Sequence, residues 1–250
     1  YKRQVWQRQS ESLISKKLDY WKHKLNGIAS LNMPADYARS PKQSVQGDSM
    51  KFKVNKILTE QLKAFSLKED VTLYMTLLTA FKVLLHRYSS QDDICVGGAI
   101  SGRLQQEFEP LIGFFVNTLA LRTDLGGQPD FREALHRVKA TLLEAYDHQE
   151  VPFERIVGQV QGDRDTSKNP LFQIVFVLQN APDVEVSALG EVKIEPIPHH
   201  YRTSQFDLHF SINETSDGLQ ADVVYCTDLF KTSTIERLVG HFETLLHSVV

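Results

Sequence analysis

The sequence predicts an α/β protein in which a layered mixed β-sheet packs against helices. Three observations favour this class: helical and strand-like segments alternate along all 250 residues, one strand-like segment is apolar almost throughout, and no repeat or low-complexity segment interrupts the pattern. Apolar residues make up 42% of the chain and charged residues 24%, which is typical of a globular protein with a sizeable core. We therefore expect one compact layered unit.

The first half of the chain predicts three helices and three strands. Residues 8–26 form the first helix, whose apolar stripe consists of Leu13, Leu18, Trp21 and Leu25. Strands are expected over 49–56, 93–100 and 115–123, and a short helix over 59–66. Thr72 begins a helix that should be deeply buried, because apolar residues cover most of its circumference: Met75, Leu78, Phe81, Val83, Leu84 and Leu85.

The second half predicts the centre of the sheet. A helix is expected over 131–146, and the near-continuous apolar run QIVFVLQ over 173–179 is typical of a fully buried central strand. Asp217-Gly218 signals a hairpin turn between strands over 206–213 and 219–227, and an amphipathic helix over 234–250 closes the chain. Residues 32–48 contain two prolines and predict an ordered loop.

Composition excludes several classes of function. The net charge is −3 and the basic residues are dispersed, which argues against nucleic acid or an anionic membrane as a partner. No apolar stretch is long enough to cross a bilayer and no signal peptide is visible, so we expect a cytoplasmic protein. Cys95 and Cys226 are the only cysteines, and both predict buried structural thiols rather than a disulfide or a metal site.

Residues 112–122 (IGFFVNTLALR) place polar groups inside an otherwise apolar strand. Gly113 permits a close backbone approach, whereas Asn117 and Thr118 must either be satisfied by partners or face a polar channel. Two alternatives therefore stay open for Asn117: a hydrogen bond to a neighbouring loop, or a place in the wall of a channel.

Two later segments favour structural roles when they are taken from the residues alone. In 148–154 (HQEVPFE), Pro152 is expected to end the preceding helix and Phe153 to pin the next helix to the core. In 164–171 (RDTSKNPL), Arg164, Asp165 and Asn169 can bond one another or the backbone, and so fix where the buried strand starts.

Taken together and in this order, the three segments resemble the condensation domains of nonribosomal peptide synthetases. The family's late motifs have the form I/V-G-x-F-V-N-T, H-Q-x-x-P-F-E and R-D-x-S-x-N-P-L, and residues 112–118, 148–154 and 164–171 match them. Residues 72–88, 98–103, 172–180 and 205–208 extend the similarity over essentially the whole chain. The resemblance implies the C-terminal lobe of such a domain, with a chloramphenicol acetyltransferase-like fold.

The resemblance also implies an activity: amide bond formation between a carrier-bound donor acyl or peptidyl thioester and an acceptor aminoacyl thioester. This lobe would form one wall of the reaction tunnel, with Gly113, Phe114, Phe115, Asn117, Thr118 and Ser204. The residues expected to hold the motifs in place are Gln149, Pro152, Phe153, Glu154, Arg164, Asp165, Asn169 and Pro170.

No catalytic residue is expected in this chain. The family's H-H-x-x-x-D-G motif belongs to the preceding lobe, and the only His pair here, His199-His200, continues as YRTSQ and does not fit it. We therefore expect the isolated chain to be inactive, with no cofactor or metal of its own. Phosphopantetheine would arrive on donor and acceptor peptidyl carrier domains, and the N-terminal lobe and a following adenylation domain would be further partners.

Three alternatives remain. The chain could be a non-catalytic lobe that only recognises carrier domains, or it could belong to an ester-forming member of the family. A free-standing trimeric acetyltransferase is disfavoured, because it needs a catalytic histidine near the C-terminus and His241 and His247 lie on an amphipathic helix.

Overall fold

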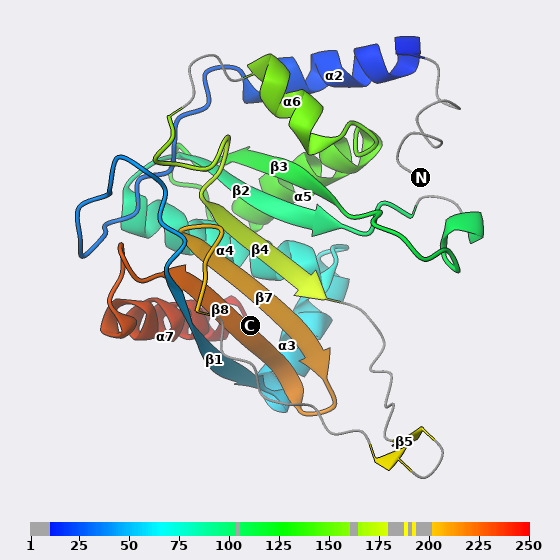
Figure 1. Ribbon diagram of the computed structural model, residues 1–250. Coiled ribbons are helices and arrows are strands. Elements are labelled where there is room, and N and C mark those ends of the chain that lie inside the picture. Colours follow the sequence, from blue (N-terminus) through cyan, green and yellow to red (C-terminus); the bar gives the residue numbers. More distant parts are fainter. Residues whose placement is uncertain (1–10, 104–105, 161–164, 180–187, 190–191, 194–201) are drawn as a thin grey trace.

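Figure 1 shows the computed structural model, which describes residues 11–103, 106–160, 165–179, 188–189, 192–193 and 202–250. A six-stranded sheet with the order β1-β8-β7-β4-β2-β3 forms its centre. Among the described residues, helices lie behind this sheet in the view of Figure 1, and others lie beyond its β3 edge. The predicted α/β class, with a layered mixed sheet and helices, is confirmed.

The described elements have the following bounds. The strands of the large sheet are β1 (Gly47–Asn55), β2 (Asp93–Ile100), β3 (Asn117–Asp124), β4 (Ile174–Gln179), β7 (Leu208–Thr215) and β8 (Gly218–Cys226), and β5 (Ala188–Leu189) and β6 (Val192–Lys193) pair separately. The helices are α2 (Glu11–Leu25), α3 (Lys56–Lys68), α4 (Leu73–Ser89), the 3₁₀ turn η1 (Gln106–Phe108), α5 (Phe131–Asp147), α6 (Phe153–Val160) and α7 (Thr232–Val249).

Three parallel strands make the middle of the sheet. β4 pairs in parallel with both β2 and β7, whereas β1–β8, β7–β8 and β2–β3 are antiparallel. Ile174, Val175 and Phe176 on β4 are buried, which confirms the central strand predicted from the apolar run. The carboxyl ends of β2, β4 and β7 therefore lie along one edge of the sheet.

Helix α4 packs against the sheet at β2 and contacts the neighbouring helices α3, α5 and α7. Its Phe81 ring packs against Phe176 on β4, Phe210 on β7 and Phe242 on α7, with ring centroids 4.8, 4.7 and 5.9 Å away. The hydroxyl of Thr72 accepts a hydrogen bond from the Met75 amide and caps the helix where the sequence predicted its start. The deep burial expected for this helix is confirmed.

Two predicted details of the helices were wrong. On α2 the inward stripe is Ile14, Trp21 and Leu25, whereas Leu13 is 44% exposed, because one residue along a helix turns the side chain by about 100°. Helix α3 begins at Lys56 rather than at Thr59, since the side chain of Asn55 accepts a hydrogen bond from the Leu58 amide and caps it earlier.

The hairpin predicted at Asp217-Gly218 is present, and so is the ordered loop expected over 32–48. Thr215 pairs with Gly218, whose φ of 124° is open only to glycine, and a Cβ there would lie 2.2 Å from the Val54 carbonyl oxygen. In the loop, the Asp36 carboxylate accepts hydrogen bonds from the Lys231 amide (2.8 Å) and the Thr234 hydroxyl (3.0 Å), at the start of α7. The loop is therefore ordered by its contacts with the C-terminal helix.

Both cysteines are free and buried, as predicted. Among the described residues, no helix is long and apolar enough to cross a membrane. Within the same residues, no cluster of three or more His, Cys, Asp or Glu side chains could hold a metal ion.

Lys82 is a buried cation that the sequence pattern did not reveal. It lies on α4 with no exposed surface, and its Nζ donates to the Leu121 carbonyl and to the Thr123 hydroxyl, both at 2.7 Å. The Thr123 hydroxyl in turn donates to Thr141 on α5 at 3.0 Å. This chain of polar groups joins α4, β3 and α5, and burial lowers the pKa of Lys82 to about 7.

We expect Lys82 to make the stability of the fold depend on pH. The folded pKa lies below the value of about 10.4 for an unfolded lysine, so between these two values the unfolded chain binds a proton that the folded chain does not. The free energy of unfolding should therefore rise, relative to that of Lys82→Met, as the pH is raised from 7 to 9.5. Urea unfolding at four pH values measures this difference. The exposed-site control Lys53→Met should follow the parent, and parallel profiles for parent and Lys82→Met would contradict the prediction.

Candidate functional site

The first motif segment belongs to an excursion between β2 and β3. Residues 101–103 and 106–116 extend beyond the carboxyl end of β2 before the chain returns as β3 (Figure 1). Apolar side chains stand out from it: Ile112 is 97% exposed, Phe114 71% and Val116 43%. Such a run of exposed apolar residues is typical of a surface that another polypeptide covers.

The excursion is held by contacts within itself. The Arg103 guanidinium lies 4.3 Å above the Phe115 ring and donates to the Phe108 carbonyl, and the rings of Phe108 and Phe115 stack at 5.9 Å. Gly102 has a φ of +64°, and a Cβ on it would lie 2.0 Å from the Phe115 carbonyl oxygen. Gly113 is exposed, and a Cβ there would come within 3.1 Å of the Phe115 ring. Residues 102 and 103 therefore support the first motif segment directly.

Asn117 uses its whole side-chain amide to bind the second motif segment. Its Nδ2 donates to the carbonyl oxygens of Gln149 (2.9 Å) and Val151 (3.0 Å), and its Oδ1 accepts from the Phe153 amide (3.2 Å). Of the two alternatives left open by the sequence, the hydrogen bond to a neighbouring loop is present. Thr118 is half-buried and pairs with Ala99 in the ladder between β2 and β3. That these residues line a tunnel stays a prediction.

The second segment is a turn between two helices. Helix α5 ends at Asp147, so the prediction that Pro152 ends it was wrong; the Pro152 carbonyl instead accepts from the Arg155 and Ile156 amides and starts α6. Gln149 Nε2 donates to the Tyr146 carbonyl at 2.8 Å and closes the turn on α5.

Phe153 and Glu154 open α6. Phe153 packs against the core, as predicted, with its ring 5.3 Å from that of Phe172. Glu154 is exposed in the first turn of α6, where a carboxylate is favoured by the helix dipole.

In the third segment, Asp165 and Asn169 bond to the backbone, as the sequence allowed, and that they fix the start of β4 stays a prediction. Asp165 Oδ1 accepts from the Ser167 amide (2.9 Å) and hydroxyl (2.6 Å), and Asn169 Nδ2 donates to the Gln205 carbonyl at 2.6 Å. The Pro170 carbonyl accepts from the Phe172 amide at 2.8 Å. Arg164 lies outside the described residues, and so do His199 and His200.

Ser204 is buried, and its hydroxyl donates to the Phe206 carbonyl. Its amide donates to the Val45 carbonyl at 3.0 Å. The side chain is thus hydrogen-bonded to the backbone of its own turn, and its place in a tunnel wall stays a prediction.

These contacts link segments that are far apart in the sequence into one group, which we call the motif cluster. Asn117 joins the first segment to the second, the rings of Phe153 and Phe172 join the second to the third, and Phe172 stacks on Phe206 at 6.0 Å. Asn169 closes the group on Gln205. The linking groups are amides, backbone atoms and aromatic rings, which suit the positioning of a substrate rather than proton transfer.

Sequence reasoning missed a polar hollow on the face of the sheet opposite the helices. His209, Ser211 and Asn213 on β7 alternate with the buried Leu208, Phe210 and Ile212. The hollow has a volume of about 490 Å³, and its remaining lining residues are Gln179, Thr203, Ser204, Gln205, Phe206, Asp222 and Val224. Burial lowers the pKa of the His209 imidazole. The period-two alternation in LHFSINET was the signal that could have predicted this face.

Comparisons with known proteins agree on one family. The family model for the Condensation domain matches residues 1–250. A linear gramicidin synthase from Brevibacillus parabrevis is 45% identical over 251 residues, which cover 98% of this chain but 5% of that relative. The chain therefore spans a small part of the length of this synthetase.

Two solved structures share the fold over nearly the whole chain. A four-domain nonribosomal peptide synthetase bound to AMP and glycine has a TM-score of 0.85 and 26% identity, covering 93% of this chain and 19% of that chain. The X-domain from teicoplanin biosynthesis, in complex with OxyB, has a TM-score of 0.86 and 25% identity, covering 97% of this chain and 54% of that one. The chloramphenicol acetyltransferase-like fold implied by the sequence is thereby confirmed.

We expect Asn117→Asp to detach the 149–153 turn from β3. The substitution keeps the acceptor for the Phe153 amide but replaces two donors with an anionic oxygen that faces two carbonyl groups. Leaving buried carbonyls unpaired costs about 1–3 kcal/mol each, so the free energy of unfolding should fall by about 2–4 kcal/mol. Urea unfolding and hydrogen exchange at the Phe153 amide measure the change. Asn213→Asp, on the open sheet face, should change stability by less than about 0.5 kcal/mol, and equal losses in both variants would refute the assignment.

Proposed function

This chain belongs to the condensation domain family, and from that premise we propose that it is one lobe of a peptide-synthetase condensation domain. In this proposal it forms one wall of the tunnel in which a carrier-bound donor thioester and an acceptor aminoacyl thioester are joined. The observation that carries the proposal is the motif cluster, in which Asn117, the 149–153 turn and Phe172 are held together beside the projecting residues 106–116.

The exposed apolar residues of the excursion support a two-lobed unit. Ile112 and Phe114 are 97% and 71% exposed. Full burial of a side chain such as Phe is more favourable than its exposure to water by about 1.5–3 kcal/mol. The matched X-domain is about twice as long as this chain, which covers 54% of it. We assign the preceding lobe, with the H-H-x-x-x-D-G motif that the resemblance places there, as the partner that covers this surface.

The reaction itself needs little chemistry from this lobe. The acceptor amine attacks the carbonyl carbon of the donor thioester, the C–N bond forms as the C–S bond breaks, and the amine proton ends on the released thiol. A free α-amine has a pKa near 7.7–8.0, so a useful fraction is neutral at pH 7. Correct orientation of two bound reactants can be worth effective molarities of about 10⁵ M or more, and holding them in place is the role proposed for the motif cluster.

Partners follow from this role. Donor and acceptor peptidyl carrier domains would bring the substrates on phosphopantetheine arms, with an adenylation domain following and the whole acting in the cytoplasm. The chain needs no cofactor of its own in this scheme.

A second candidate function is recognition without catalysis. The X-domain that shares this fold is found in complex with OxyB, so a lobe of this shape can belong to a domain that binds another protein. An ester-forming reaction would use the same tunnel wall, with a hydroxyl oxygen instead of an amine nitrogen as the attacking atom.

A condensation assay separates these functions. We expect the isolated 250-residue chain to give no condensation product above a no-protein control, and the complete two-lobed domain to give product from carrier-bound substrates. The preceding lobe, made separately, should restore turnover when it is mixed with the chain. Product from the chain alone would overturn the two-lobe proposal. Carrier binding without any product from the complete domain would favour the recognition lobe.

We expect the excursion to matter only when both lobes are present. In the complete domain, Ile112→Ser combined with Phe114→Ser should lower the condensation rate at least about tenfold to a hundredfold, because burial of even one of these two large apolar side chains contributes about 1.5–3 kcal/mol. Limited proteolysis should cut residues 101–116 faster in the same variant. Leu67→Ser, at an α3 position that is 82% exposed, is the matched control and should leave both readouts unchanged. An unaltered rate in the double variant would remove the excursion from the lobe interface.

A further inference from the structure

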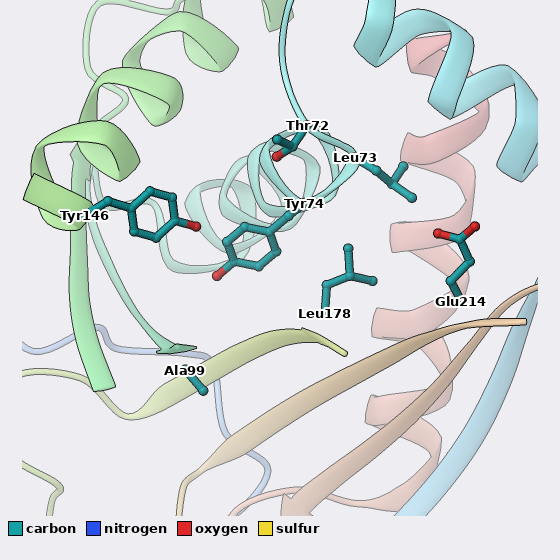
Figure 2. A pocket seen from close by; sticks show the side chains of 7 residues that line it. All are labelled: Thr72, Leu73, Tyr74, Ala99, Tyr146, Leu178 and Glu214. Carbon is teal, nitrogen blue, oxygen red and sulfur yellow. The ribbon is translucent and has the colours of Figure 1, made fainter. Parts of the chain in front are cut away.

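A pocket lies where the parallel strands end. It is lined by Ala99 on β2, Leu178 on β4, Glu214 on β7, Tyr146 on α5 and three residues at the start of α4: Thr72, Leu73 and Tyr74 (Figure 2). Its volume is about 360 Å³. Small-molecule sites occupy about 300–1,000 Å³ and in α/β sheets lie outside the carboxyl ends of the strands. The pocket therefore has room for one amino-acid side chain.

The lining suits an uncharged side chain. In Figure 2, the rings of Tyr74 and Tyr146 stand on one side and the aliphatic groups of Leu73 and Leu178 on the other. The carboxylate of Glu214 is paired with Lys63 on α3 at 2.5 Å. An added charge in the pocket would thus lose water without gaining a free counter-charge, whereas an apolar or aromatic group would gain contacts.

Tyr146 offers a polar contact inside the pocket. Its hydroxyl has no hydrogen-bond partner among the residues that the structure describes, whereas the Tyr74 hydroxyl donates to the Phe176 carbonyl at 3.3 Å. Burial raises the pKa of Tyr146, so its hydroxyl stays protonated and available as a donor.

The motif cluster sets the position of the pocket walls. The Tyr146 carbonyl accepts from Gln149 Nε2 at 2.8 Å, and the carbonyl of the same Gln149 is held by Asn117. On the other side, Ala99 pairs with Thr118 in the sheet. A ligand in this pocket is therefore in contact with elements that two of the three motif segments fix.

We propose that this pocket binds the side chain of an aminoacyl substrate, with selectivity for uncharged aliphatic or aromatic side chains over charged ones. The inference rests on the proposed function, because it names which group of the substrates the lobe recognises. Both the acceptor and the donor carry such side chains, so either substrate could place its side chain in the pocket. The experiment varies the two substrates separately and so shows which of them the pocket binds.

Leu178→Trp in the complete domain tests the pocket by filling it. In one series the acceptor residue is Gly, Leu, Phe or Lys with a fixed donor, and in the other series the donor residue is varied with a fixed acceptor. kcat/KM is measured for each substrate in both series. We expect the variant to lower kcat/KM for Phe and Leu by at least tenfold in one series, mainly through KM, and to leave Gly within about twofold. Leu143→Trp adds the same bulk on α5 at a position that is 49% exposed and should change none of the values.

A binding measurement keeps this inference separate from the proposed catalysis. The N-acetylcysteamine thioester of phenylalanine should bind the parent domain more tightly than the glycine thioester in calorimetry, and Leu178→Trp should abolish the difference. If Phe and Gly substrates lose kcat/KM equally in both series, or if the thioesters bind the parent alike, the pocket assignment is overturned while condensation stands. If no preparation condenses but the phenylalanine thioester still binds selectively, the proposed function fails and the pocket remains.

Discussion

The arrangement of the candidate site depends on the hydrogen bonds that the Asn117 side chain makes to the turn at 149–153. Both of its amide hydrogens and its oxygen are engaged with the backbone at 149–153, so the first residue of β3 is tied to the start of α6. Without this bond, the turn between α5 and α6 would carry two unpaired carbonyl groups and an unpaired amide. A net stabilisation of about 1 kcal/mol for each hydrogen bond is modest, but these bonds hold the turn that carries Phe153 and that the Gln149 side chain joins to Tyr146.

The periodicity of the sequence predicted the elements well and their side-chain detail less well. The helix after Thr72, the central strand and the terminal hairpin all stand where the apolar pattern put them, because burial of one face or of both faces leaves a strong signal. Leu13 was placed in the core in error, since the adjacent apolar residue Ile14, about 100° further round the helix, takes the inward position instead. Local patterns also gave Pro152 the wrong role, because the chain needs a five-residue turn between α5 and α6.

The candidate site was only partly predictable, because its contacts cross long distances in the sequence. Asn169 was expected to bond the backbone, but its partner, the Gln205 carbonyl, comes from a segment that nothing local connects to it. Lys82 was hidden within an apolar helical run, and its partners Leu121 and Thr123 become evident only once β3 is placed beside α4. The pocket beside Tyr146 combines several elements and has no signature in any one of them.

The electrostatic character of this lobe fits the reaction proposed for it. An attacking amine with a pKa near 8 must lose its proton, and an unpaired carboxylate nearby would stabilise the protonated form and raise that pKa. The carboxylate in the pocket lining, Glu214, is neutralised by Lys63, and the motif cluster is joined by amides and aromatic rings. A wall of this kind can orient an amine and leave its proton affinity unchanged, so that the group which removes the proton can stand on the opposite lobe.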